Sequence, residues 1–394
     1  MNFVTNNFNF SSENRIVTPN SKGFGRIIKA VRRYFLNIFK NKPIHIGASL
    51  LFSFSHSCIQ WIRNTIKTNT DVTGTKDISL NEYTVLFVEQ VVAGARQTDH
   101  GRNYAPSTIK TIRQSLKQFK LYQLEKRRIY DFSDIDMSFY YDYTAFLKGK
   151  GYSVNTIGKC VRQLKAVLRA AELEGFYINP GWKDKRFKGY RVDVDSIYLT
   201  QADLDRMMAV DLSGLSPSYE YVRDVFMVGV YTAQRVSDYN RICKSDFKTV
   251  RKEKQDIIYL NIYQRKTGTK VAIPCNGPMK AILDKYNYRL PHLDDHLINR
   301  HIKEIARLAG LTESVEIMTT KGGVRKRVRY EKWQLVHSHT ARRTGATLMY
   351  LAGVDLYDIM RVTGHSSPLM LKKYIKAETL EVVEKLSEKY DYFK

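Results

Sequence analysis

Cysteine is scarce in this sequence, and its placement argues against a structural zinc site. The four cysteines, Cys58, Cys160, Cys243 and Cys275, lie far apart and form no C-x-x-C pair. Zinc-binding and disulfide-rich domains both need cysteines at close, regular spacings, so we expect reduced thiols in a cytoplasmic protein. No acidic triad with the spacing of a metal site is evident either. We therefore expect neither a metal nor another cofactor.

The sequence also lacks a secretory pattern, because its first basic residue, Arg15, precedes no apolar run with a small-residue cleavage site. One stretch, Ile44 to Ile62, has no Lys, Arg, Asp or Glu over nearly the ~20 residues that cross a bilayer. It contains four serines, two histidines and a glutamine, so we expect a partly buried helix there rather than a membrane span.

Acidic residues are few relative to basic ones. The chain has 39 Asp plus Glu against 64 Lys plus Arg, a formal net charge of +25. An excess of this size favours a polyanionic partner, of which nucleic acid is the usual case. A solvated basic surface, as on ribosome-associated or membrane-surface proteins, is the alternative.

A chain of 394 residues is too long for one compact core, and a hydrophobic content of 43% is enough for packed interiors. We predict a basic N-terminal extension (1–76), a helical domain (77–176), a linker (177–196) and a domain of helices with a short sheet (197–394). The extension has a strong basic excess and one amphipathic stretch, so it could bind DNA or an anionic membrane surface.

Two helices of the helical domain each combine an apolar stripe with a basic one. In the first helix, apolar residues from Ile109 to Phe119 recur at intervals of three and four. Ser107 and Ser153 are predicted to cap the two helices. Although a charged helix face is usually only solvated, two all-basic stripes favour contact with phosphates. The cations are Lys110, Arg113, Lys117 and Lys120 on the first helix, and Lys159, Arg162, Lys165 and Arg169 on the second.

Two β-hairpins are predicted in the C-terminal half. The segments Ile257–Tyr263 and Lys270–Pro274 are rich in β-branched and aromatic residues and flank a Thr267-Gly268 turn. A basic ribbon from Lys321 to Lys332 has Gly322-Gly323 as its turn.

Six further residues could together form a cage for one phosphodiester. A phosphodiester under in-line attack needs fixed cations at its two non-bridging oxygens, and arginine provides a planar, permanently charged fork. His339 precedes Arg342 by three residues, so both lie on one face of a helix. The six candidate catalytic residues are Arg235, Lys266, His339, Arg342, His365 and Tyr374.

Tyr374 is the candidate nucleophile of this set. It follows His365 by nine residues, within a predicted helix from Pro368 to Lys376. A phenol has a pKa of ~10 in water, so it needs cationic neighbours or a general base to attack at neutral pH. Lys266, at a hairpin tip, suits the general acid that protonates the leaving alkoxide.

Each of these residues alone has a simpler explanation. Arg235 could form a salt bridge with Asp238, and His365 could cap a helix. A further polar cluster has irregular spacing and is predicted to be a solvated helix start rather than a metal site. This cluster comprises His292, Asp294, Asp295, His296 and His301.

In order and spacing, the motifs resemble those of the tyrosine recombinase (phage integrase) family. The similarity covers residues 77–394. It rests on Thr232-Ala-Gln-Arg-Val-Ser-Asp238, Lys266, His339-Thr-Ala-Arg-Arg-Thr344, Gly364-His-Ser-Ser367 and Tyr374. Two departures are small: Ala233 stands where the family often has glycine, and Asp238 where glutamate is frequent.

The resemblance implies a helical core-binding domain followed by a mainly helical catalytic domain with a small antiparallel sheet. It also implies that a DNA 3′-phosphate is transferred to Tyr374, and that the 5′-hydroxyl of a partner strand then attacks the phosphotyrosine. The expected partners are double-stranded DNA, three further copies of the chain in a tetramer, and accessory DNA-bending proteins, with no membrane. In this family an N-terminal extension such as 1–76 often binds arm-type DNA sites.

Two other functions remain open at this point. A type IB topoisomerase uses similar chemistry without joining two DNA sites, and a catalytically idle DNA-binding regulator would need no nucleophile. The C-terminal tail, with Leu380, Val383 and Leu386 on one stripe, either covers the protein's own core or docks on a neighbouring protomer.

Overall fold

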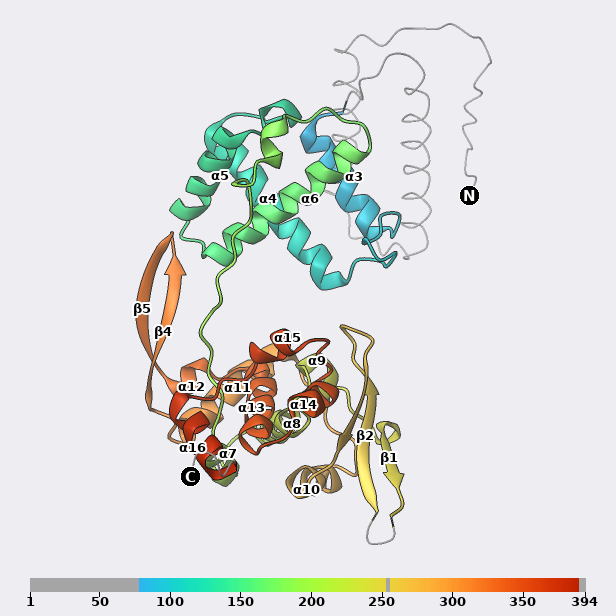
Figure 1. The fold of residues 1–394 in the computed structure, drawn as a ribbon, viewed down its shortest axis with the longest axis vertical. Helices are drawn as coiled ribbons and strands as arrows, with labels where there is room; N and C mark the ends of the chain where they lie inside the picture. The colour runs from blue at the N-terminus through green and yellow to red at the C-terminus, as the bar shows by residue number, and fades with distance from the viewer. Residues whose placement is uncertain (1–77, 253–255, 390–394) are drawn as a thin grey trace, which may run out of the picture. The chain divides into compact units, whose positions relative to one another are not determined.

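The computed structural model describes residues 78–252 and 256–389, so the predicted extension and its Ile44–Ile62 stretch lie outside the described residues. Four helices form the helical domain: α3 (Leu80–Val92), α4 (Pro106–Lys126), α5 (Met137–Gly149) and α6 (Val154–Leu173), with a short 3-10 turn η1 (Phe132–Asp134) before α5 (Figure 1). No helix in the described part of the chain is long and apolar enough to cross a membrane.

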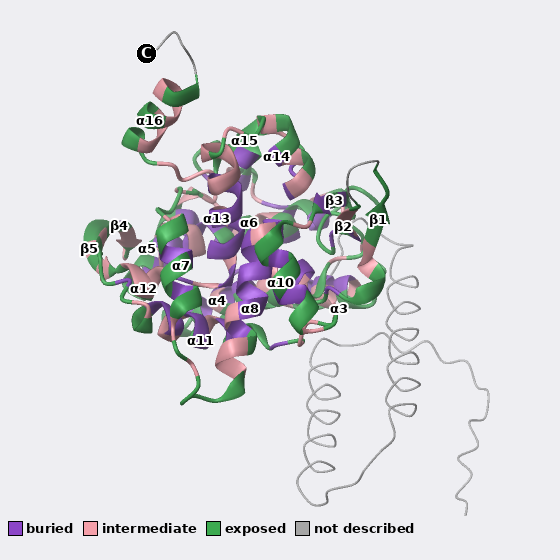
Figure 2. Ribbon diagram, turned by 90° about the horizontal axis from the view of Figure 1, so that it is seen from below, coloured by how far each residue is buried: buried purple, intermediate pink, exposed green. Residues whose placement is uncertain are grey.

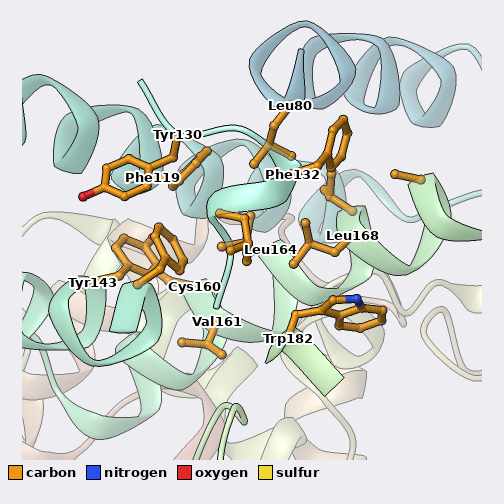
Figure 3. Close-up of a cluster of buried hydrophobic side chains, with 14 of the residues drawn as sticks. Leu80, Phe119, Tyr130, Phe132, Tyr143, Cys160, Val161, Leu164, Leu168 and Trp182 are labelled. Atoms are coloured by element: carbon orange, nitrogen blue, oxygen red, sulfur yellow. The ribbon is translucent and has the colours of Figure 1, made fainter. Parts of the chain in front are cut away.

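The apolar stripes predicted from the sequence form the core of this domain (Figure 3). Phe119 of α4 and Leu164 of α6 are 2% and 1% exposed. Aromatic rings make up much of the rest of this core. The ring centroid of Tyr122 lies 5.1–5.7 Å from the ring centroids of four other residues, Tyr130, Phe139, Tyr143 and Phe146. This packing holds the α4 and α6 backbones in place, which sets the helix faces from which the basic side chains extend.

One of the two predicted helix caps is confirmed. The hydroxyl of Ser153 accepts a hydrogen bond from the backbone N–H of Thr156 at 3.3 Å. The other prediction was wrong, because α4 begins at Pro106 and Ala105 is its N-cap residue, with no side-chain cap. Proline is preorganised for the first helical position, so Ser107 lies inside the helix.

The chain after α6 remains attached to the helical domain as far as Val192, whose N–H donates to Oδ1 of Asn155 in α6 at 3.0 Å. A 3-10 turn η2 (Pro180–Lys183) contains Trp182, which is 6% exposed, and Phe187 is 1% exposed. Both belong to the core of the helical domain. Within the predicted linker 177–196, the irregular segment therefore starts after Phe187.

The C-terminal half, predicted to be the catalytic domain, is mainly helical, as expected. Its first helices are α7 (Gln201–Ala209), α8 (Pro217–Thr232), α9 (Val236–Tyr239), α10 (Gly277–Lys285) and α11 (Asp295–Leu308). The later ones are α12 (Lys332–Leu335), α13 (Ser338–Leu351), α14 (Leu356–Thr363), α15 (Pro368–Lys372) and α16 (Thr379–Lys389), and a 3-10 turn η3 (Lys244–Asp246) precedes the first strand.

Two antiparallel sheets complete this half. Strands β1 (Phe247–Val250), β2 (Ile257–Tyr263) and β3 (Lys270–Pro274) pair in that order. Tyr263 lies opposite Lys270, which confirms the predicted hairpin. The second sheet is a ribbon of β4 (Ser314–Lys321) and β5 (Val324–Glu331) that turns at Gly322-Gly323 as predicted but begins seven residues earlier than Lys321.

Helices α8 and α13 pack closely at the centre of the catalytic half, where both are largely buried (Figure 2). A Cβ on Gly345 of α13 would lie 2.1 Å from the carbonyl oxygen of Val230 in α8. Only glycine allows this approach, and it brings the N-terminal half of α13, with His339 and Arg342, beside the end of α8.

The C-terminal elements differ from the prediction in one respect. Helix α15 ends at Lys372, so Tyr374 lies in the turn that follows it and not inside a helix reaching Lys376. In α16, Leu380 and Val383 are 67% and 55% exposed, whereas Leu386 is partly buried. The predicted apolar stripe is thus mostly exposed in the part of the chain that the structure describes.

Candidate active site

Arg342 is the most deeply buried charged side chain of the site. It is 0% exposed. Its Nη1 donates to the carbonyl of Ala233 at 3.0 Å, and its Nη2 donates to the carbonyl of Thr363 at 2.8 Å. Nη2 also lies 3.0 Å from Nε2 of His365, while Nε has no partner. Burial, followed by the repulsion of Arg235, lowers the pKa of this guanidinium.

The hydrogen bonds of His365 define which of its nitrogens carries the proton. The Thr363 hydroxyl donates to the carbonyl of Ile359 at 2.6 Å and lies 2.8 Å from Nδ1 of His365. Since its own proton is used, the hydroxyl oxygen accepts from Nδ1–H. The lone pair on Nε2 then faces Arg342. His365 therefore has a neutral imidazole whose Nε2 accepts a hydrogen bond from Arg342.

Tyr374 lies against Arg342 and the two histidines. Its ring centroid is 4.6 Å from that of His365 and 5.3 Å from that of His339, and the Arg342 guanidinium carbon lies 5.1 Å from it. The Tyr374 N–H donates to the carbonyl of Leu371 at 2.7 Å. These contacts hold a tyrosine in a positively charged pocket outside any helix.

The histidines of the pocket are neutral near pH 7. Burial lowers the pKa of His339 to about 4, with further contributions led by Arg343 and His337. Burial and Arg342 lower the pKa of His365 to about 3. Nearby cations and low solvent exposure both disfavour the charged imidazole, so both rings are neutral and weakly basic in the free protein, and an anion bound beside them would raise both pKa values.

These low pKa values predict a loss of stability in mild acid. Between the unfolded value of 6.5 and the folded values of about 4 and about 3, the unfolded chain binds protons that the folded one does not. The free energy of unfolding should therefore fall as pH drops below 6.5, by up to about 1.4 kcal/mol per pH unit for each histidine. Urea unfolding at pH 7 and pH 5 measures this.

In that experiment, replacing His339 and His365 by glutamine should reduce the loss of stability between pH 7 and pH 5. His296→Gln, at an exposed position of α11, is the matched control. Unfolding energies that fall equally in the double variant and the wild-type protein would contradict the assignment.

Arg235 joins the same pocket through an amide and not through an acid. Its Nη1 donates to Oε1 of Gln264 at 3.1 Å. Asp238, suggested as its salt-bridge partner, instead accepts from the backbone N–H of Arg265 at 2.7 Å and pairs with Arg241 at 3.6 Å. The Arg235 guanidinium thus keeps its charge uncompensated by that carboxylate, as a phosphate-binding arginine requires.

Lys266 lies in the turn between β2 and β3 and is exposed. The turn is closed by the Gly268 N–H, which donates to the Gln264 carbonyl at 2.8 Å, and by the Gln264 N–H, which donates to the Thr269 carbonyl at 2.8 Å. The ammonium group therefore projects from an ordered loop that starts two residues after the amide bound to Arg235.

The polar cluster at α11 is a solvated helix start at Asp294, Asp295 and His296, as expected, but the prediction was wrong for His301, which is buried inside the helix. The Asp294 side chain accepts from the N–H of His296 at 2.7 Å and caps the helix. His301 is buried and its ring stacks on that of Tyr219, with centroids 3.9 Å apart. Among the described residues, no group of three or more His, Cys, Asp or Glu is placed to hold a metal ion.

Two family models match the chain in consecutive segments. The phage integrase SAM-like domain matches residues 85–187, and the phage integrase family matches residues 198–381. The chain belongs to the tyrosine recombinase (phage integrase) family. It is accordingly a site-specific recombinase of the tyrosine type, and the pocket around Tyr374 lies in its catalytic half.

Solved structures agree on the fold of this recombinase. A λ integrase dimer bound to a COC′ core site has 17% identity and a TM-score of 0.53, and the match covers 74% of this chain and 97% of that one. XerH recombinase bound to palindromic difH has 16% identity, a TM-score of 0.52, and coverages of 81% and 91%. The Tn1549 transposon integrase bound to right-end DNA has 14% identity and a TM-score of 0.51, and the match covers 79% of this chain and 99% of that one. None of the curated protein sequences matches at a significant level.

The recombinase has an alanine, Ala233, where the family often has a glycine, and the backbone conformation shows why glycine suits this position. Ala233 has φ 51° and ψ 28°, in the left-handed region that favours glycine. Its carbonyl accepts the Nη1 bond of Arg342. The left-handed turn therefore aims this carbonyl at the buried arginine, and alanine tolerates the strain.

Sequence reasoning missed Gln264, the amide bound to Arg235. A signal was present, because Leu260, Ile262 and Gln264 alternate along the strand and are all buried. A polar residue in phase with buried apolar ones must find hydrogen-bond partners inside the protein. The pattern thus indicates that Gln264 is buried and hydrogen-bonded, although not that it lies beside Arg235 or which groups it binds.

The predicted DNA-binding cations of the recombinase differ in their surroundings. Lys110, Arg113, Lys117 and Lys120 of α4 are all exposed, as are Lys159 and Arg169 of α6. Arg162 donates to the carbonyl of Gly189 at 2.7 Å, and Lys165 donates to that of Phe187 at 2.6 Å. These last two side chains hold the chain after α6 in place, so the α4 stripe is the better candidate for phosphate contact.

Proposed function

We propose that this protein cleaves and rejoins double-stranded DNA through a 3′-phosphotyrosyl intermediate at Tyr374, and that it integrates or excises a mobile element. The observation that carries the proposal is the packing of Tyr374 against Arg342, His339 and His365. A tyrosine that had only a structural role would not need two neutral imidazoles and a buried guanidinium around its ring.

The residues support a balanced reaction. Tyr374 Oη attacks the phosphorus, and its proton passes to the neutral imidazole of His339, whose ring centroid lies 5.3 Å from that of Tyr374. The bond between phosphorus and O5′ breaks, and the electron pair stays on O5′, which takes a proton from the Lys266 ammonium. Arg235 and Arg342 bind the non-bridging oxygens, where negative charge develops. Rejoining reverses each step with the 5′-hydroxyl of a partner strand.

A covalent-capture experiment tests this function and selects the DNA site in the same step. The protein is incubated with a pool of nicked duplexes of randomised sequence, and adducts are isolated on a denaturing gel and sequenced. A protein-linked strand ending in a 3′-phosphate supports the proposal. Failure to recover any adduct would favour an idle DNA-binding regulator.

The topoisomerase alternative makes a different prediction. A type IB topoisomerase relaxes supercoiled plasmids with little regard to sequence, whereas a recombinase joins two copies of the captured sequence. Incubating plasmids with and without two such copies separates them. The family assignment and the match to a transposon integrase support the recombinase.

Binding of DNA through the α4 stripe should depend steeply on salt. Each lysine that contacts a phosphate contributes about 0.9 to the slope of log affinity against log salt concentration. Replacing Lys117 and Lys120 by glutamine should therefore lower the slope by about 2. Lys126→Gln is the matched control, because this lysine of the same helix is paired with Asp142 at 2.7 Å. An unchanged slope in the double variant would rule out this face.

We propose that the protein acts as a homo-tetramer on DNA and that α16 contributes to assembly, because Leu380 and Val383 are exposed on it. Deleting residues 380–394 should abolish tetramers on DNA and leave single-protomer binding intact, as measured by native gels or sedimentation. Deletion of residues 390–394 alone is the control. Tetramers that persist without residues 380–394 would contradict the role of α16.

A further inference from the structure

A buried amide at the start of the loop between β2 and β3 connects three segments of the active site. Gln264 is 1% exposed. Its Oε1 accepts from Nη1 of Arg235 at 3.1 Å and from the hydroxyl of Thr267 at 2.8 Å. Its Nε2 donates to Oε1 of Gln234 at 2.6 Å and to the carbonyl of Thr363 at 2.8 Å. These four bonds use the whole capacity of a primary amide, so its orientation is fixed.

The amide oxygen of Gln264 links the phosphate-binding candidate Arg235 to the loop that carries the candidate general acid Lys266. One of its bonds anchors the guanidinium of Arg235, and the other anchors Thr267, the residue next to Lys266. On the nitrogen side, the Thr363 carbonyl accepts from Gln264 and also from Nη2 of Arg342 at 2.8 Å. One side chain thus fixes the lysine loop relative to both arginines.

The segment before His365 is built closely around this amide. A Cβ on Gly364 would lie 2.6 Å from the Gln264 amide, and Gly364 has φ 69°. A larger residue there would have to displace Gln264. The close approach leaves the amide no room to turn.

We propose that Gln264 is a positioning residue for strand cleavage, which holds Lys266 at the distance from Arg235 at which it can protonate the leaving O5′. The inference rests on the function proposed above and extends it, because Gln264 has no role in the chemistry of the six candidate residues. Without Gln264, the phosphate could still bind, but the general acid would be misplaced.

A change of leaving group separates this role from a structural one. When sulfur replaces the 5′-bridging oxygen, the strand leaves as a thiolate and needs little protonation, because a thiol has a pKa of about 8.5. Loss of a general acid slows the oxygen substrate by about 10²–10⁴-fold and should hardly affect the sulfur substrate. Rates of covalent-complex formation are measured on both, using the captured sequence.

We expect Gln264→Leu to slow the oxygen substrate by about 10²-fold and the sulfur substrate by less than about 10-fold. Lys266→Ala should show the same pattern, and adding Gln264→Leu to it should cause little further loss on oxygen, because both act on one step. Asn261→Leu, an amide replaced on the same strand, is the matched control. Thr267→Val, at an exposed position, removes one hydrogen bond to Gln264. It should slow cleavage of the oxygen substrate less than Gln264→Leu does, and it should slow the sulfur substrate less still.

Equal losses on both substrates, or no loss, would overturn the positioning role of Gln264. Should Gln264→Leu not fold, the same comparison for Thr267→Val decides. A wild-type protein that forms no covalent complex with either substrate would contradict the proposed function itself, and this inference with it. If instead the wild-type protein reacts and Gln264→Leu slows cleavage of both substrates equally, only the positioning role of Gln264 is contradicted.

Discussion

Tyr374→Phe is expected to abolish formation of the covalent complex while leaving the protein folded and able to bind DNA. Phenylalanine keeps the ring that packs against His365 at 4.6 Å and His339 at 5.3 Å, so little packing energy is lost. The hydroxyl is the nucleophile, and no other group can replace it in the attack on phosphorus. The loss of cleavage should therefore be complete within the detection limit of a denaturing gel.

Tyr357→Phe is the matched control for this experiment, because Tyr357 of α14 is 65% exposed. Its covalent complex should form at the wild-type rate. DNA affinity of Tyr374→Phe, measured on the captured sequence, should stay within about threefold of wild type, since no cation is removed. If Tyr374→Phe still became linked to DNA, the nucleophile would lie elsewhere.

Arg342→Lys should give the second-largest effect, although it keeps the positive charge. A lysine cannot reproduce the planar fork that binds two oxygens at once. Loss of an arginine at a transferring phosphoryl group reduces rates by about 10³–10⁵-fold. Cleavage of the captured sequence in single-turnover experiments, with enzyme in excess, measures this loss in the chemical step.

The same substitution should also destabilise the fold. The buried carbonyls of Ala233 and Thr363 would lose their Arg342 donors, which costs about 1–3 kcal/mol for an unsatisfied group. Arg361→Lys is the control for both measurements, because its side chain is 85% exposed. Wild-type cleavage by Arg342→Lys would show that this guanidinium does not contact the transition state.

The sequence predicted those features that depend on local periodicity or on short motifs. The apolar stripes of α4 and α6 were predicted because buried residues recur at helical spacing, and the β2–β3 hairpin because β-branched runs flank Thr267-Gly268. His339 and Arg342 were placed together for a similar reason, since a spacing of three puts two side chains on one helix face.

Features that depend on contacts between distant segments could not be predicted in this way. The end of α15 at Lys372 is followed by a turn in which Thr347 of α13 binds the backbone: its hydroxyl donates to the Tyr374 carbonyl at 3.4 Å and accepts from the Lys376 N–H at 3.0 Å. The bonds of Arg162 and Lys165 to the chain after α6 likewise depend on tertiary packing. The cap at Ser107 failed for a local reason, since Pro106 occupies the first helical position.

The charge distribution of the pocket creates a conflict between stability and activity. Arg235 and Arg342 repel each other, and both lower the pKa values of His339 and His365. A carboxylate introduced beside them would relieve this repulsion and make the free protein more stable. The same carboxylate would occupy the place of the DNA phosphate. Selection for a more heat-resistant form of this protein is therefore expected to alter its helical core or its surface, and to leave the electrostatic strain around Tyr374 in place.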